Sequence, residues 1–197
     1  MLYTTIGTYD DCISAQQFVK ELKTLELANS KVNLRINSGG GSVYEGIAIF
    51  NAIRNSRCEI DCYIDGIAAS MASLIAMACK KVYMSKYARL MTHLPSGGAW
   101  GNAAELRTTA DELDALTATA VLMYKGKTGL NDADVTAKFL NGKDSWFSAA
   151  EAKKAGLIDD IYDGAAVAIP DNVTDKTALW NTYNMQLNHE QTLIIIS

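Results

Sequence analysis

The sequence predicts one α/β domain with a mainly parallel sheet, and three observations lead there. Short apolar runs of strand length alternate with stretches of helical spacing over residues 32–156. Alternation of this kind is typical of helices layered on a parallel sheet. The chain has 197 residues, enough for one sizeable core, and an ordinary globular composition with 49% hydrophobic and 20% charged residues. We therefore expect one domain over residues 1–163, followed by a tail or arm over residues 164–197 that contains the second proline and an apolar end.

The predicted strands are short apolar runs, each followed by a turn or loop signal. The first, VNLRI, precedes a run of glycines, and the second, EIDCYI, precedes the turn dipeptide Asp-Gly. The remaining two lie close together and lead into a proline- and glycine-containing loop over residues 94–101. In chain order these strands are residues 32–36, 59–64, 81–84 and 89–93.

The predicted helices have apolar residues at helical spacing or a recognisable start and stop. Ser42 and Glu45 form the pattern of a capping box, so the first helix should begin at about Val43. Asn131 is a predicted N-cap, and Gly156 is a predicted stop. In chain order the helices are residues 43–54, 70–78, 102–125, 131–140 and 148–156.

Charge and cysteine usage exclude several classes of function. The net charge is −4 and the pI is about 5.2, which argues against a nucleic-acid partner. There is no CxxC pair and there are only two histidines, so we expect no metal site and no cofactor. The first residues lack the features of a secretory signal, and the uncharged apolar stretch at residues 66–79 is too short to span a bilayer. We expect a cytoplasmic protein without a membrane partner.

The stretch NSGGGSVYEG at residues 37–46 places three glycines between a predicted strand and a predicted helix. It fits neither phosphate-binding pattern. Ile47 stands where a P-loop requires lysine, and Tyr44 stands where a dinucleotide loop requires its third glycine. Two interpretations remain: a bare strand-to-helix turn, or a loop whose N–H groups are approached by an extended ligand.

Three polar residues could form a nucleophilic site. Ser70, in DGIAASMAS, stands at the start of an apolar helix, where N–H groups and the helix dipole favour a nucleophile, although a serine there is commonly only an N-cap. The possible bases are His93, at the end of a predicted strand, and His189, in the tail. Asp144 precedes an aromatic pair and a short helix, where it could orient a histidine or serve as a turn residue.

Taken together, these stretches resemble the proteolytic subunit of the Clp protease family. The resemblance runs from about Arg35 to Asp160 and includes INSGGGSVYEG, GIAASMAS, MTHLPSGG and DSWFSAAEAKKAGLID, in the family's order and at similar spacings. INSGGGSV and GGAWGNA resemble especially the ClpP-related head maturation (prohead) proteases of phages. The resemblance implies a ClpP/crotonase-like spiral of repeated ββα units.

The resemblance also implies roles for individual residues. Ser70 matches the nucleophile, His93 the general base and Asp144 the residue that orients the histidine, while the N–H groups of Gly41 and Met71 match the oxyanion hole. Residues expected to flank the substrate are Gly40, Ser42, Pro95, Ser96 and Gly97.

Ser73 is the other serine near the start of this helix, and three positions differ from the family pattern. Ser73 lies one turn into the helix, so its hydroxyl should face a packed neighbour or a backbone carbonyl. The chain has Gly39, Ala72 and Leu94 where the family has proline, glycine and glutamine, and none of these removes a catalytic group.

The expected function is an ATP-independent serine endopeptidase that cleaves a phage capsid or scaffold precursor in the host cytoplasm or prohead. This expectation rests on the N-terminus: only about 35 residues precede the INS motif, whereas Clp subunits carry an axial loop that meets an ATPase. The resemblance implies a heptameric ring or stacked rings, with residues 102–125 as the helix that would join two rings. The alternative for this helix is a core helix within one subunit. Other possibilities are a housekeeping Clp subunit that works with an ATPase, an acyl-CoA enzyme, and a non-catalytic or latent shell subunit.

Overall fold

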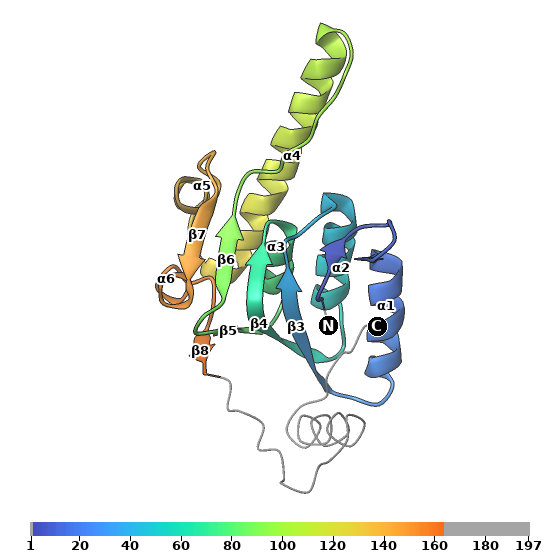
Figure 1. The fold of residues 1–197 in the computed structure, drawn as a ribbon, viewed down its shortest axis with the longest axis vertical. Helices are drawn as coiled ribbons and strands as arrows, with labels where there is room; N and C mark the ends of the chain where they lie inside the picture. The colour runs from blue at the N-terminus through green and yellow to red at the C-terminus, as the bar shows by residue number, and fades with distance from the viewer. Residues whose placement is uncertain (1, 164–197) are drawn as a thin grey trace, which may run out of the picture.

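The computed structural model describes residues 2–163, which form a curled sheet with helices packed against it (Figure 1). The expected tail, residues 164–197, and with it His189, lies outside the described residues.

The main sheet has six strands in the order β7-β6-β4-β5-β8, with β3 paired to β4. All pairs are parallel except β6 with β7, which confirms the prediction of a mainly parallel sheet. A separate parallel pair joins β1 (Thr5–Ile6) to β2 (Cys12–Ile13). The strands of the main sheet are β3 (Lys31–Ser38), β4 (Glu59–Ala69), β5 (Lys81–Ser85), β6 (Arg89–Thr92), β7 (Ser145–Ser148) and β8 (Asp160–Tyr162).

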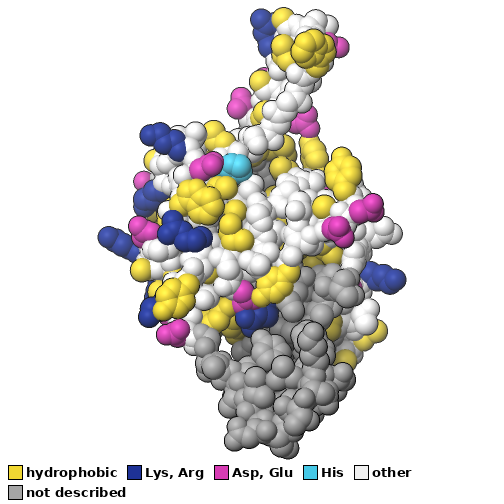
Figure 2. Space-filling view, viewed as in Figure 1, with side chains coloured by type: hydrophobic (Ala, Val, Ile, Leu, Met, Phe, Trp, Pro, Cys, Tyr) yellow, Lys and Arg dark blue, Asp and Glu magenta, His cyan; other side chains and the backbone are white. Residues whose placement is uncertain are grey.

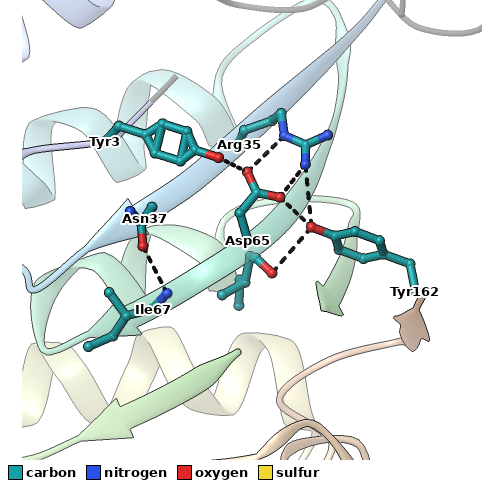
Figure 3. Close-up of polar contacts among 7 residues, drawn as sticks. Tyr3, Arg35, Asn37, Asp65, Ile67 and Tyr162 are labelled. Atoms are coloured by element: carbon teal, nitrogen blue, oxygen red, sulfur yellow. Dashed lines mark hydrogen bonds and ion pairs between the residues drawn. The ribbon is translucent and has the colours of Figure 1, made fainter. Parts of the chain in front are cut away.

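β4 is the central strand, and it is longer than the predicted residues 59–64. It pairs with β3 along one edge, while its other edge pairs first with β5 and then, from Ile67 to Ala69, with β6. The strand continues through Gly66 because the Asn37 side chain supports the irregularity there: its Oδ1 accepts the Ile67 N–H at 3.1 Å, beside a register shift in β3 (Figure 3). This extension carries the chain directly to Ser70.

Each predicted helix is present, and a further helix, α1, precedes them. Asn102, Asn131 and Ser148 each accept N–H hydrogen bonds as N-caps, and Gly156, at φ +78°, follows the last helix as predicted. The helices are α1 (Ala15–Glu26), α2 (Val43–Arg54), α3 (Met71–Met77), α4 (Ala103–Thr128), α5 (Asp132–Phe139) and α6 (Ala149–Lys154).

One predicted cap is wrong. The first predicted helix does begin at Val43, but Ser42 makes no side-chain capping bond. Glu45 instead accepts the N–H of Ala15 at 2.5 Å, at the start of α1. The tertiary contact between two helices has replaced the local capping box.

The core lies between the sheet and the helices. Val32, Leu34 and Ile36 alternate along β3 and are fully buried, in one cluster with Ile49 of α2 and Ile75 of α3. Burial of such side chains contributes roughly 1.5–3 kcal/mol each relative to exposure. The core therefore fixes α2 and α3 on the strands that end at the candidate site.

α4 differs from the other helices in how little of it is covered. Its buried residues, Ala120, Val121, Met123 and Tyr124, lie near its C-terminal end. The rest extends away from the sheet, and Figure 2 shows hydrophobic side chains at the tip of this projection. A helix buried along its whole length, the alternative considered above, does not describe α4.

A polar cluster ties both ends of the described chain to the sheet (Figure 3). The Arg35 guanidinium donates to the Asp65 carboxylate through Nε at 2.8 Å and also through Nη2. The hydroxyls of Tyr3 and Tyr162 donate to the same carboxylate. Asp65 thus holds the N-terminal segment and β8 against β3 and β4.

Candidate active site

Ser70 lies between the end of β4 and the start of α3, in an unusual backbone conformation. Its φ is +53°, in the left-handed region that non-glycine residues rarely adopt. Its N–H donates to the carbonyl of Met91 in β6 at 3.0 Å, and its side chain makes no capping bond to α3. The N-cap alternative therefore does not describe Ser70.

His93 supplies the partner of the Ser70 hydroxyl. It follows the last residue of β6, and its Nε2 lies 2.7 Å from Ser70 Oγ. At this distance a neutral imidazole can accept the hydroxyl proton through Nε2, which requires that Nδ1 carry the ring hydrogen.

Asp144 lies on the other side of the imidazole ring. Its Oδ1 is 3.4 Å from His93 Nδ1, an ion-pair distance slightly longer than an ordinary hydrogen bond. The antiparallel register of β6 with β7 explains the approach: Thr92 pairs with Ser145, so His93, which follows Thr92, lies opposite Asp144, which precedes Ser145. The Asp144 side chain is 62% exposed and that of His93 is 27% exposed, so solvent reaches the carboxylate.

Two of the three loop glycines have positive φ, +100° at Gly40 and +146° at Gly41. A Cβ on Gly40 would lie only 2.7 Å from the Ala69 carbonyl oxygen and 2.8 Å from Ser70 Cβ. A Cβ on Gly41 would overlap the Ile6 carbonyl. The glycines are thus required first by close packing between the nucleophile on one side and β1 on the other.

The contacts with β1 determine which backbone groups of the loop are available. Ile6 donates to the Gly40 carbonyl at 2.9 Å and accepts the Ser42 N–H at 2.8 Å. In a parallel pairing of this pattern, the N–H and C=O of the bracketed residue, Gly41, point away from the partner strand. The Gly40 N–H is donated to Ser38 Oγ at 3.2 Å. The N–H groups of Gly40 and Ser42 are therefore already bonded within the protein, whereas the N–H of Gly41 can be offered to a ligand.

An apolar pocket opens beside Ser70 and His93. Pro95 is part of its wall, and the exposed Ser96 and Gly97 continue the loop beyond it. The other apolar side chains come from three helices; they are Val43, Ile47, Met71, Leu74, Leu116, Ala120 and Met123.

Comparison with known proteins assigns the family. The sequence model of the Clp protease family matches residues 4–165. The chain belongs to the Clp protease family. The chain is 32% identical over 160 residues to an ATP-dependent Clp protease proteolytic subunit of Bacteroides fragilis, covering 79% of this chain and 76% of the relative. It is 34% identical over 164 residues to proteolytic subunit 2 of Corynebacterium diphtheriae, covering 81% of each, and 30% identical to proteolytic subunit 3 of Streptomyces coelicolor, covering 84% and 77%.

Membership of the Clp protease family makes the chain a serine endopeptidase, as the resemblance implied. It favours a peptidase over the acyl-CoA enzyme considered above. The finer resemblance to phage prohead proteases has no support in the names of these relatives.

Two features of the candidate site were not predicted from the sequence. Ser38 both accepts the Gly40 N–H and donates to the Thr4 carbonyl at 2.6 Å, which fastens the glycine loop to the N-terminal segment. Tyr124 contacts Ser73, whose hydroxyl, as predicted, faces a backbone carbonyl. A tyrosine within the helical apolar pattern of α4 gives no sequence signal that it has a polar partner.

Over residues 2–163, the structure holds no helix that is long and apolar enough to cross a membrane. The same residues include no group of three or more metal-ligating side chains.

Proposed function

We propose that the chain hydrolyses peptide bonds with Ser70 as nucleophile, His93 as general base and Asp144 as the group that orients the imidazole. The observation that carries the proposal is the 2.7 Å approach of His93 Nε2 to Ser70 Oγ, with Asp144 on the Nδ1 side. As Ser70 Oγ attacks the substrate carbonyl, Nε2 takes its proton and then delivers that proton to the leaving amine. Water attacks the resulting acyl-enzyme, again with His93 as base.

The tetrahedral oxyanion would be stabilised by the N–H groups of Gly41 and Met71. The pairing pattern of β1, which turns the Gly41 N–H away from Ile6, supports the first donor. The position of Met71 directly after the nucleophile, at the N-terminus of α3, supports the second. One such donor is typically worth about 3 kcal/mol of transition-state stabilisation.

The substrate would lie between the glycine loop and the segment that contains Pro95, Ser96 and Gly97. In the glycine loop, the N–H groups of Gly40 and Ser42 are bonded within the protein, so these two residues would contact the substrate only through packing. Gly41 would donate its N–H to the substrate. The apolar pocket beside Ser70 would take an apolar side chain of the peptide.

We further propose that this endopeptidase is a Clp-type proteolytic subunit that works with an ATPase in the cytoplasm. The relatives named above are called ATP-dependent Clp protease proteolytic subunits, which supports this alternative over ATP-independent cleavage of a capsid precursor. As part of this proposal, the fold is a ClpP-like spiral of repeated ββα units, and the protease domain ends near residue 163.

Self-association into a ring, heptameric by family resemblance, would involve the projecting part of α4. Leu106 on this part is exposed, as is Trp100 in the loop before it, and Leu122 is exposed at the packed end of the helix. Large exposed apolar side chains along one projecting element are typical of an interaction surface. A second copy would cover them and enclose the site.

The role can be tested with the purified chain, a Clp ATPase, ATP and a folded protein that carries a degradation tag. We expect peptide hydrolysis by the chain alone and degradation of the folded protein only with ATPase and ATP. Sedimentation should show a ring-sized species. Peptide hydrolysis with no ATPase-dependent degradation, and no binding to ATPase rings of several Clp types, would contradict the partnership and leave the peptidase assignment intact.

A further inference from the structure

A buried chain of hydrogen bonds leads from α4 to the backbone of the proposed nucleophile. The Ser73 hydroxyl donates to the Ser70 carbonyl at 2.6 Å, and the Tyr124 hydroxyl lies 2.7 Å from Ser73 Oγ. Both side chains are almost completely inaccessible, at 0% and 1% exposure. The three residues come from different parts of the site: the end of β4, the first turns of α3 and the packed end of α4.

The direction of each hydrogen bond follows from the donor inventory. A serine hydroxyl has one hydrogen, and Ser73 gives it to the Ser70 carbonyl. Tyr124 must therefore donate its own hydrogen to Ser73 Oγ. Burial raises the pKa of Tyr124, so its hydroxyl retains the proton that this arrangement requires.

The Ser70 carbonyl, which accepts the Ser73 hydroxyl, belongs to the same peptide group as the N–H of Met71, a proposed oxyanion donor. Ser70 C=O and Met71 N–H belong to one planar trans peptide, so fixing the oxygen also fixes the direction of the N–H. Hydrogen bonds to the oxygen polarise the peptide and make its N–H a stronger donor, because neighbouring bonds in a chain reinforce one another. The carbonyl also accepts the N–H groups of Ser73 at 3.0 Å and Leu74 at 3.4 Å, and the hydroxyl adds to these.

Stability alone does not account for the pair. Replacing both partners of a buried hydrogen bond with apolar groups of similar shape is nearly neutral for stability. Replacing both residues, by alanine and phenylalanine, would leave neither hydroxyl buried without a partner. The pair instead supports a residue whose backbone is strained, since Ser70 has φ +53°.

We propose that Tyr124 and Ser73 are positioning residues that orient and polarise the Met71 N–H toward the oxyanion. This inference rests on the proposed function, in which Met71 is one of the two donors. It assigns to α4 a part in the chemistry at Ser70 that goes beyond lining the pocket.

The test compares Ser73→Ala, Tyr124→Phe and the double variant. For each we would measure kcat and KM for a short peptide, the rate of Ser70 modification by a fluorophosphonate, the melting temperature and the assembly state. Ser73→Ala should lower kcat about threefold to tenfold, well below the loss of roughly 10² or more on removing an oxyanion donor outright, with KM unchanged. Tyr124→Phe should lower kcat about twofold to threefold, because it removes only the second bond of the chain.

The double variant separates a positioning role from a structural one. Ser73→Ala leaves the Tyr124 hydroxyl buried without its partner, which should lower the melting temperature. Adding Tyr124→Phe should restore the melting temperature while kcat stays at the value of Ser73→Ala. Tyr87→Phe, which alters an exposed tyrosine, is the control and should leave kcat and the melting temperature unchanged.

Two results would overturn the inference. If kcat recovers together with the melting temperature in the double variant, the pair is only structural. If the single variants hydrolyse peptide at the wild-type rate, the orientation of the Met71 N–H does not depend on the hydrogen bonds of Ser73 and Tyr124. A wild-type protein that fails to react at Ser70 would overturn the proposed function itself, and this inference with it, so the two failures are distinguishable.

Discussion

His93 Nε2 lies 2.7 Å from Ser70 Oγ although 23 positions separate the two residues in the chain. The pairing of β4 with β6 brings them together: Ala69 pairs with Met91, and the Ser70 N–H donates to the Met91 carbonyl. Both side chains therefore emerge where two neighbouring parallel strands end. The sheet register sets this contact before any substrate binds.

Asp144 should contribute to catalysis through orientation of the His93 ring. Proton transfer by a well-placed base contributes about 10²–10⁴ in rate, and we expect Asp144→Asn to forfeit a part of this, about tenfold to a hundredfold in kcat. The effect should stay at the lower end because the carboxylate is exposed and 3.4 Å from Nδ1. Peptide hydrolysis measures it, with Asp111→Asn on the exposed face of α4 as control. Equal rates for the two variants would remove Asp144 from the site.

Gly41 should tolerate no side chain, whereas Gly39 should. A Cβ at Gly41 would overlap the Ile6 carbonyl, and its φ of +146° is unfavourable for other residues. Gly41→Ala should therefore lose about 1–3 kcal/mol of folding stability and most peptidase activity, because the loop and β1 have to move apart, which displaces the Gly41 N–H proposed for the oxyanion. At Gly39 a Cβ would meet none of the described atoms within 4 Å, so Gly39→Ala should behave like wild type. Denaturant melts and peptide assays of both variants check this, and similar losses in the two would refute it.

Gly46 should be needed for the placement of Met71. In α2, a Cβ at Gly46 would overlap the Met71 side chain, which is itself buried. Gly46→Ala should lower kcat despite the better helix propensity of alanine, because Met71 and its N–H must shift. Gly126→Ala provides the matched control, since that helical glycine is exposed and alanine should add about 0.5–1 kcal/mol of stability there. Wild-type kcat in Gly46→Ala would show that the site accommodates the extra methyl group.

The cluster around Asp65 should make the fold sensitive to alkaline pH. Burial, together with the hydrogen bond and negative charge of Asp65, raises the pKa of Tyr3 from 10.0 to about 12, and burial beside Asp65 raises that of Tyr162 as well. A tyrosine whose pKa is higher in the folded state stabilises the fold fully below the unfolded pKa, and this contribution is lost as pH rises from about 10 through 12. Tyr3→Phe should therefore show a smaller loss of unfolding free energy across this interval than wild type.

Denaturant titrations at several alkaline pH values, with Tyr87→Phe for comparison, measure this difference. Tyr87 is exposed, and its ring lies beside the Lys86 ammonium. The same pH dependence in Tyr3→Phe and wild type would show that the Tyr3 hydroxyl does not contribute through Asp65.

The sequence predicted the elements that carry strong local signals and failed where tertiary contacts decide. The helix starts at Asn131 and Ser148 could be predicted because cap and helix lie within a few residues of each other. The capping box at Ser42 was wrong because Glu45 bonds to α1 instead. β4 was predicted too short because the Asn37 side chain, distant in the sequence, supports the strand beyond Gly66.

The candidate site shows the same division. The positions of Ser70, His93 and Asp144 followed from resemblance to a family and not from local pattern, since each alone has an ordinary structural interpretation. The reason for the glycines could be predicted only in part. From the sequence we expect a ligand to approach the glycine backbone closely, whereas in the structure β1 and Ser70 already pack closely against it. β1 is two residues long and carries no strand signal of its own.

Activation of Ser70 by His93 can be measured directly by covalent modification with a fluorophosphonate probe, followed by mass spectrometric mapping of the modified residue. We expect modification at Ser70, with a rate that falls at least about a hundredfold in His93→Ala while the fold is retained. A well-folded, assembled sample that is not modified at Ser70, or a His93→Ala variant that reacts as fast as wild type, would show that His93 does not activate Ser70.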